Sequence, residues 1–342
     1  MAPKIQIPAD YDFKVRVCVN YAHHPWNLHR NPKTAEIKQV AEFFAGRCAR
    51  LRGLMQLPAQ IGNATIKLRD TFTRSIFEVT GRLEAGELTA EQQKKIESRS
   101  NDLFAEMADQ TIRLQGTPEW DDHVLKSLVD GLVAVEHMGA DPRSFGMLQA
   151  SMMSYLTTGW TIIETMSGDL WEAALNAHPS SLANLTGSPK RLKGGQVNKS
   201  SAQSAKEWKS VSLDDISMHG FNIENKMGSI LRSKFNFASL EGIREAYACA
   251  FGNRSPQVER ALIDPSLDSL SAIRNVIVHR DAHADNEYIK KTKGLGALPK
   301  AELREHILLN GDIVVRLLKP AIVAANQLLI AVDDWLAKAR QA

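Results

Sequence analysis

The sequence has too few cysteines for a disulfide framework. It contains three, Cys18, Cys48 and Cys249, which is an odd number, and no two of them form a CxxC pair. Small secreted domains that depend on disulfides carry many more cysteines, and structural zinc sites need paired ligands. Both classes are therefore excluded, and we expect a protein of the reducing cytoplasm.

A long apolar run is also lacking. No stretch of about 18 consecutive apolar residues occurs, which is the length that a membrane-spanning helix needs. The N-terminus, MAPKIQIPADYDFKVRV, carries charges where a signal peptide requires an unbroken apolar segment. We expect neither a membrane span nor export.

A strong excess of one charge sign is absent as well. The chain has 42 Lys and Arg against 39 Asp and Glu, a formal net charge of +3. This charge is too small to attract nucleic acid over long distances, so any RNA contact must come from a local basic patch. With 44% hydrophobic and 24% charged residues in 342, the chain has the composition of a soluble folded protein and the length for two ordinary domains.

The N-terminal part is predicted to be mainly helical. Residues 1–33 alternate apolar and polar side chains, which predicts a short strand or an extended arm. From residue 34 to about residue 138 apolar side chains recur every three to four positions, as in helices, and Thr89 begins a capping box. Residues 139–146 contain two glycines and a proline, so we place a domain boundary there, between 1–140 and 141–342.

Helical patterns dominate the C-terminal part too. Residues 179–209 interrupt them with a basic loop, and its Lys190, Arg191 and Lys193 are candidate RNA-binding residues together with Arg280. The helical segments are predicted at 147–177, 213–216, 223–231, 240–251, a helix opened by Pro265, and 303–340 with a kink at Pro320. The fold class is therefore all-α, with a helix bundle at the C-terminal end.

The helix opened by Pro265 carries an arginine among its apolar side chains. At about 100° per residue, one apolar arc holds Leu267, Leu270, Ile273, Ile277 and Val278. Arg274 falls inside this arc, and an arginine on such a face must pair with a carboxylate, extend its guanidinium to solvent, or line a cavity or interface. Glu164 is a candidate partner, the alternative being a carboxylate at the edge of its own helix stripe. Asn275 and His279, four residues apart, share a neighbouring face.

The stretch RNVIVHRDAHAD resembles the motif of HEPN domains, in which an Arg, usually followed by Asn, Asp or His, precedes a His by a few residues. The surroundings are similar as well: a long helix of the type WTIIETMSGDLWEAALN, an EAYACAF-like segment, the motif helix and a closing helix. The resemblance covers residues 147–342. It implies a HEPN-like helix bundle preceded by an additional helical region, 1–140, of unknown role.

This resemblance implies a metal-independent RNA endonuclease without a cofactor, acting as a homodimer whose two motifs form one composite site. The 2′-hydroxyl of RNA is the nucleophile, so the site needs a group that transfers protons and a cation that stabilises the phosphorane. His279 and Arg274 are residues of these types, and Asn275 would orient His279 or hold a phosphate oxygen. The implied roles include toxin and antiphage effector, with an activating or inhibitory protein partner.

Several alternatives remain open at this stage. The chain can be a non-catalytic HEPN-like module that binds nucleotide, RNA or a protein, or an all-helical interaction protein in which the motif is structural. His279, His283 and Asp285 have a spacing that metal ions use, but no further ligands accompany them, so we assign no metal. Asp169 and Glu172 are interpreted as ordinary exposed charges, and the HHPWNLHR segment as a surface arm.

Overall fold

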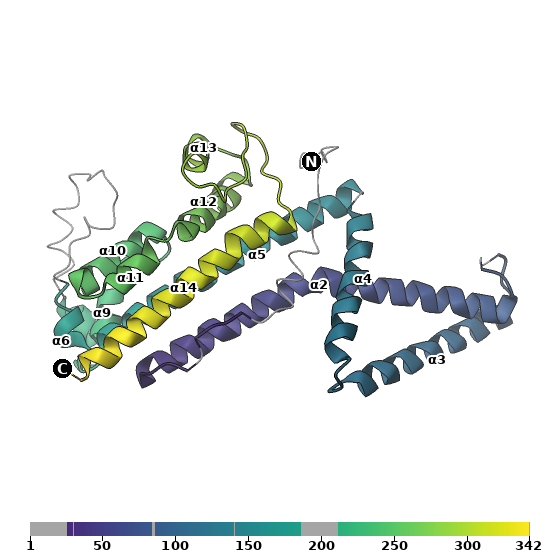
Figure 1. Ribbon diagram of the computed structural model, residues 1–342, viewed down its shortest axis with the longest axis horizontal. Helices are drawn as coiled ribbons and strands as arrows, with labels where there is room; N and C mark the ends of the chain where they lie inside the picture. The colour runs from purple at the N-terminus through teal and green to yellow at the C-terminus, as the bar shows by residue number, and fades with distance from the viewer. Residues whose placement is uncertain (1–25, 30, 84–85, 140, 186–210, 342) are drawn as a thin grey trace. The chain divides into compact units, whose positions relative to one another are not determined.

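The computed structural model describes residues 26–29, 31–83, 86–139, 141–185 and 211–341 (Figure 1). Within these residues the chain forms helices joined by loops and no β-strand, and an isolated bridge joins His283 to His306. The predicted all-α class is confirmed. Residues 1–25 of the strand or arm predicted over 1–33, and the basic side chains Lys190, Arg191 and Lys193, fall outside the described residues. Residues 26–29 and 31–33 of that segment form no strand.

The chain divides into two compact units. Unit 1 includes Arg52–Gln149 and Asn310–Asp312, and unit 2 consists of Trp26–Leu51, Ala150–Leu309 and Ile313–Ala342. This division differs from the boundary predicted near residue 140, because the first part of the chain contributes to unit 2. Pro142 begins a long helix, as prolines in a first helical turn commonly do, so residues 142–146 lie within a helix. Unit 1 extends to Gln149 and unit 2 resumes at Ala150 within the same helix.

Unit 1 contains the second part of α2 (Ala35–Thr80), α3 (Ala90–Leu114) and α4 (Trp120–Met138). The predicted capping box is confirmed: Thr89 accepts a hydrogen bond from the backbone of Gln92, whose side chain accepts one from Thr89. Helices α2 and α4 cross closely at Gly62 and Gly131. A β-carbon on Gly131 would lie 1.8 Å from the carbonyl oxygen of Ala59, so glycine is required there.

Three long helices form the frame of unit 2: the first part of α2, α5 (Pro142–Ala177) and α14 (Gly311–Ala339), with α5 and α14 side by side in Figure 1. They meet at Gly159 of α5, where a β-carbon would lie 2.2 Å from Leu318 of α14 and 3.6 Å from Leu51 of α2. Because small residues let helix axes approach, this contact sets the spacing of the frame. The buried thiols of Cys48 on α2 and Cys249 on α10 belong to the same unit.

Shorter helices complete unit 2. They are α6 (Pro179–Leu182), α8 (Leu213–Ser217), α9 (Met227–Arg232), α10 (Leu240–Phe251), the 3₁₀ turn η2 (Gly252–Arg254), α11 (Pro256–Leu262), α12 (Pro265–Arg280) and α13 (Asn286–Thr292). Helix α10 is fixed on α5 by two buried hydrogen bonds, from the Trp171 indole to the Ala246 carbonyl at 2.9 Å and from the Tyr247 hydroxyl to the Ser167 carbonyl at 2.8 Å. Because α6 occupies Pro179–Leu182, the loop predicted over 179–209 begins with a helical turn.

The helix predicted over 303–340 begins only at Gly311. Residues before it run beside the end of α12: the amides of Arg304 and Ile307 donate to the carbonyls of Ala284 and Ala282, and the amide of Ala284 donates to Glu305. These backbone groups are paired between segments, so they are unavailable for the first turns of a helix. Pro320 lies within α14, which continues through it.

The segment before α2 packs against α14. The carboxylate of Asp333 is fully buried and accepts hydrogen bonds from the amides of Lys33 and Thr34, the hydroxyl of Thr34 and the ring of His29. Burial alone would raise the pKa of Asp333, but these hydrogen bonds lower it below the usual value. His29 is thus bound to the core of unit 2, which corrects its assignment to a surface arm.

Among the described helices, α14 alone is long and apolar enough to cross a membrane by length and composition. Its most apolar window has a mean hydropathy of 1.6, and 56% of that window is buried inside the structure. A core helix of a soluble protein has these properties as well. The expectation that no segment could span a membrane is therefore modified, because α14 has the length and composition to do so. Its packing against α5 accounts for the apolar side chains of α14.

Candidate catalytic site

Helix α12 begins and ends at strong local signals. Asp264 caps its first turn by accepting a hydrogen bond from the amide of Ser266, and Pro265 follows with a backbone suited to a first turn. The helix ends at Arg280, where Asp281 and Ala282 both adopt left-handed conformations with φ of 50° and 58°. The end of the helix within HRDAHAD is confirmed, and the αL residues are typical of a helix C-terminus.

The buried face of α12 is rotated from the predicted one. Val278, assigned to the apolar arc, is 51% exposed, whereas Ser269, Ala272 and Val276 are buried. The prediction was wrong there because it followed large apolar residues, while small residues make the close contacts in this core. Arg274 therefore lies at the edge of the buried face, and its side chain keeps 21% exposure.

Arg274 is held between two neighbours. Its Nη2 lies 3.8 Å from Oε1 of Glu164 on α5, and its Nη1 donates a hydrogen bond to Oδ1 of Asn275 at 3.1 Å. Of the two alternatives that the sequence leaves open for Glu164, the structure has the ion pair with Arg274. Since 3.8 Å is beyond hydrogen-bonding distance, the Glu164 contact leaves guanidinium N–H groups available to an incoming anion.

Glu164 is itself fixed within unit 2. Its carboxylate accepts a hydrogen bond from the indole of Trp160, one helical turn earlier, and its side chain is 13% exposed. Burial raises the pKa of Glu164 above its usual value, although the Trp160 hydrogen bond and the Arg274 charge both act against the rise. The carboxylate of Glu164 thus positions Arg274, although its own burial carries an unfavourable desolvation free energy.

Arg274, Asn275 and His279 line one cavity of about 380 Å³, and exposed Arg280 lines it as well. The other lining residues are Ala238, Ser239, Ala272, Val276, Asp285, Glu287, Tyr288 and Lys291. The cavity thus holds a braced guanidinium, an amide and an exposed imidazole. These groups are suited to binding a phosphate diester and moving a proton near it.

The wall of this cavity opposite α12 is formed by α13. Asp285 caps α13 by accepting the amide of Tyr288 at 2.8 Å, and it also accepts from Nε of Arg280 at 3.3 Å. The Tyr288 amide is the main reason that the pKa of Asp285 is lowered. The Tyr288 hydroxyl donates to the Pro299 carbonyl at 2.7 Å, so α13 is held to the loop that follows it.

The metal-ligand alternative gains no support from the described residues. Asp285 serves as a helix cap, and the His283 ring packs edge-on against His306, with Nδ1 of His283 2.8 Å from the Asp281 carbonyl. No group of three or more His, Cys, Asp or Glu side chains within the described part of the chain is arranged to hold a metal ion. His283 and Asp285 therefore have structural contacts.

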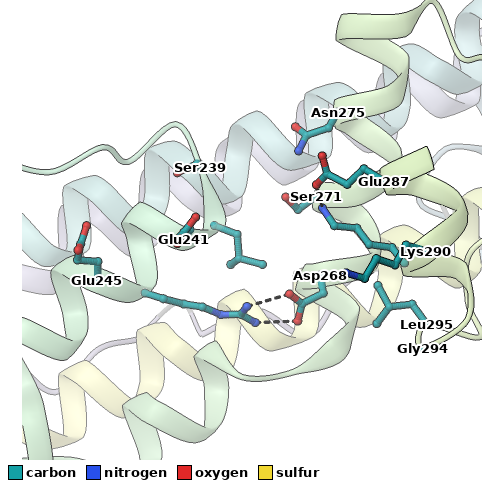
Figure 2. Close-up of a pocket in the computed structure, with 13 residues that line it drawn as sticks. Ser239, Glu241, Glu245, Asp268, Ser271, Asn275, Glu287, Lys290, Gly294 and Leu295 are labelled. Carbon is teal, nitrogen blue, oxygen red and sulfur yellow. Dashed lines mark hydrogen bonds and ion pairs between the residues drawn. The ribbon is translucent and has the colours of Figure 1, made fainter. Parts of the chain in front are cut away.

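A second, larger cavity of about 780 Å³ adjoins the first (Figure 2). Ser239, Asn275, Glu287 and Lys291 line both cavities. Arg244 forms one wall: its two terminal nitrogens donate to both oxygens of Asp268 at 2.8 Å, and its Nε donates to the Leu262 carbonyl at 2.8 Å. This cavity could not be predicted from the sequence, because only tertiary packing brings α10, α12 and α13 together.

Asp169 and Glu172 are not ordinary exposed charges. Nη1 of Arg232 lies 2.9 Å from Asp169 and 2.6 Å from Glu172, and Arg47 lies 3.7 Å from Asp169. Burial raises the pKa of Glu172, but hydrogen bonds from Ser229 and Arg232 lower it overall. These partly buried pairs connect α2, α5 and α9, so their role is to join helices of unit 2.

Comparisons with protein-family models, with curated proteins and with solved structures found no match for this chain. The case for a function therefore rests on the residues of the site and on their geometry.

Proposed function

We propose that this protein is a metal-independent RNA endonuclease of the HEPN type, in which Arg274 and His279 act on a phosphate diester. The observation that carries the proposal is the shared cavity of Arg274, Asn275 and His279, with Arg274 braced by Glu164. A cation preorganised beside a histidine provides the two chemical elements that transesterification of RNA needs.

In the proposed reaction the 2′-hydroxyl oxygen attacks the adjacent phosphorus, and the bond from phosphorus to the 5′-oxygen breaks. The 2′-hydroxyl loses its proton, and the leaving 5′-oxygen gains one, so the products are a 2′,3′-cyclic phosphate and a 5′-hydroxyl. Arg274 stabilises the charge on the phosphorane oxygens, and His279 transfers a proton. Asn275, whose side-chain oxygen accepts from Arg274, orients the guanidinium.

The two proton transfers favour a site built from two copies of the chain. One cavity contains one motif histidine, and a homodimer that places two His279 side chains around one cleft supplies a base and an acid. The exposure of His279 is compatible with such pairing. A cytoplasmic toxin or antiphage effector, controlled by a protein partner, is the biological role that we propose.

The test uses purified protein, labelled single-stranded RNA and EDTA. We expect cleavage by the wild type, with a rate about 10²- to 10⁴-fold lower for His279→Ala, the range that general acid–base groups contribute. His219→Ala is the matched control, since His219 is partly exposed in the same unit and does not line the cavity. Cleavage that His279→Ala leaves unchanged overturns the proposal.

A non-catalytic nucleotide- or RNA-binding module is the second candidate. It is favoured by one observation: among the described residues His279 has no hydrogen-bond partner that would fix its tautomer, as catalytic histidines commonly have. RNA that binds with a dependence on Arg274 but is not cleaved in EDTA or in magnesium would support this candidate over the enzyme.

A further inference from the structure

The larger cavity continues from the proposed catalytic site. Asn275 lines both cavities from α12 and Lys291 lines both from α13, so a polymer bound at Arg274 can extend into the larger one. Its volume of about 780 Å³ lies within the range of about 300 to 1,000 Å³ that small-molecule sites occupy. The space is thus large enough for a nucleoside.

The lining of the larger cavity carries both signs of charge: the basic side chains are Arg244, Lys290 and Lys291, and the acidic ones are Glu241, Glu245, Asp268 and Glu287. These charges differ in their availability. The two dashed lines at Asp268 in Figure 2 are the hydrogen bonds from the terminal nitrogens of Arg244. Its Nε donates to the Leu262 carbonyl, so all three side-chain nitrogens are engaged and Arg244 forms a fixed wall. Within the described part of the chain, Lys291 has a single ion pair, an exposed one 2.7 Å from Glu287 one turn away, and such pairs contribute little. Lys290 has no carboxylate partner among the described residues. The lysines of α13 can therefore bind an anion without breaking the fold.

The remaining lining suits a nucleoside. Leu240 and Leu295 provide apolar surface against which a base can pack, and Ser239 and Ser271 provide hydroxyl groups. Bases reach such a cavity only when they are unstacked, which single-stranded RNA permits and a continuous A-form helix does not. The apolar side chains and hydroxyls are matched to a base and a ribose. A phosphate is matched to the lysines of α13, since α10 contributes the acidic side chains Glu241 and Glu245 to the lining.

We propose that the cavity between α10, α12 and α13 binds one nucleoside of single-stranded RNA next to the scissile phosphate, and that Lys290 and Lys291 bind the following phosphate. This inference rests on the proposed function for the position of the scissile phosphate. The substrate class is single-stranded RNA, recognised on this chain's own surface beside the motif.

The test measures binding separately from cleavage. The probe is a short fluorescein-labelled single-stranded RNA with 2′-O-methyl groups, which keep the bases and phosphates but block the nucleophile. We expect Lys290→Gln/Lys291→Gln to raise the Kd about tenfold near physiological salt and to reduce the slope of log K against log salt by about 0.7, the value for one phosphate contact with a single strand.

Lys95→Gln is the matched control. Lys95 on α3 forms an exposed pair with Glu91 four residues away at 2.7 Å, the same geometry as Lys291 and Glu287. We expect this variant to bind like the wild type. Equal effects of the α3 and α13 substitutions, or a wild type that does not bind the probe, overturn the proposal.

A second variant tests the cavity without changing charge. A β-carbon on Gly294, which lines the cavity, meets only the Lys291 carbonyl at 4.0 Å, and one on Gly296 meets nothing within 4 Å. We expect Gly294→Leu to fill part of the cavity and weaken binding several-fold, and Gly296→Leu to leave it unchanged. Unchanged binding by both Gly294→Leu and the lysine variant, or equally tight binding of duplex RNA, overturns the nucleoside site.

The two proposals fail in distinguishable ways. If His279→Ala leaves cleavage unchanged while the lysine and Gly294 variants weaken probe binding, the catalytic proposal fails and the nucleoside site stands. If cleavage requires His279 while binding is indifferent to those variants, the nucleoside site fails and the catalytic proposal stands.

Discussion

At the scale of single residues, Arg274 is defined by its position at the edge of a buried helix face. Glu164 compensates its charge from α5, while Asn275 accepts one of its hydrogen bonds from the adjacent position on α12. The guanidinium is thus partly desolvated and still open to the cavity. Electrostatic interactions in such a site are stronger than on an exposed surface.

Glu164→Gln tests the cost of burying this carboxylate. The folded-state pKa of Glu164 is raised above the ordinary value of 4.5, so folding binds its proton more tightly. Its favourable contribution is complete below about pH 4.5 and is lost as pH rises through the raised pKa. We therefore expect the stability of Glu164→Gln relative to wild type to increase over that window and then to level off.

Urea unfolding at a series of pH values measures this difference. Glu91→Gln, at an exposed carboxylate on α3, is the control and should differ from wild type by the same small amount at every pH in the window. A difference between wild type and Glu164→Gln that stays constant from pH 4.5 to pH 7 would contradict the expectation. The same variant should cleave RNA more slowly, because Arg274 loses its charged partner.

At the scale of elements, helix ends with strong local signals were predictable, whereas the start of α14 at Gly311 and the buried face of α12 were not. The start of α12 at Pro265, its end within HRDAHAD and the capping box of α3 all follow from local chemistry, which the sequence contains. The buried face of α12 depends instead on Ser269 and Ala272, whose burial only packing determines. The pairing of Arg244 with Asp268 likewise joins α10 to α12 through the tertiary fold.

The crossing of α2 and α4 in unit 1 gives a prediction of its own. A β-carbon on Gly131 would lie 1.8 Å from the Ala59 carbonyl oxygen and 2.9 Å from the Asn63 amide nitrogen, both backbone atoms that cannot move aside alone. We expect Gly131→Ala to destabilise unit 1 by at least about 1–3 kcal/mol, the usual cost of overpacking. Thermal unfolding measures the effect.

Gly53→Ala is the matched control for this crossing. Gly53 also lies within α2, but a β-carbon there would meet nothing within 4 Å. Since alanine is favoured over glycine inside helices, we expect a gain of up to about 1 kcal/mol. Equal stability of Gly131→Ala and wild type would show that the two helices do not approach as closely as the structure has them.

At the scale of the whole molecule, the first part of α2 belongs with residues that are more than a hundred positions later. Ile37, Phe44 and Cys48 are buried in unit 2, and Arg47 pairs with Asp169 of α5. The boundary predicted at residue 140 could not reveal that the first part of α2 packs in unit 2. The apolar pattern of an amphipathic helix shows that one face is buried but does not identify the surface that it covers.

A chain of residues 141–342 should therefore fail to fold as unit 2 does. It lacks the apolar side chains of Trp26–Leu51, and the faces of α5 and α14 at Gly159 and Leu318 lose a neighbour. We expect the full chain to unfold in a cooperative thermal transition, the 141–342 chain to lack this transition, and a peptide of residues 26–51 to restore it. A cooperative transition of the 141–342 chain at the same Tm as the full chain would contradict this.

Asp333 joins positions about 300 residues apart in sequence, and acid should weaken that junction. Its folded-state pKa lies below the ordinary 3.8, so its contribution is present above about pH 3.8 and is lost as pH falls through the lowered value. We expect Asp333→Ala to cost about 3–5 kcal/mol at neutral pH, the range for one partner of a buried polar network, and less in acid.

Asp334→Ala provides the comparison. Asp334 is the next residue, is exposed, and pairs with Lys33 at 2.6 Å on the surface. Its loss should change stability by less than about 1 kcal/mol, as for other surface ion pairs. Equal effects of the two substitutions in urea unfolding at neutral pH would refute the special role of Asp333.

The two buried thiols of unit 2 have a consequence for chemical labelling. Cys48 on α2 and Cys249 on α10 are each 1% exposed, so an alkylating reagent reaches either sulfur only when its helix separates from its neighbours. The alkylation rate of each thiol thus reports a different local opening of the same unit. A ligand that binds in the cavity beside α10 should lower the alkylation rate of Cys249 more than that of Cys48.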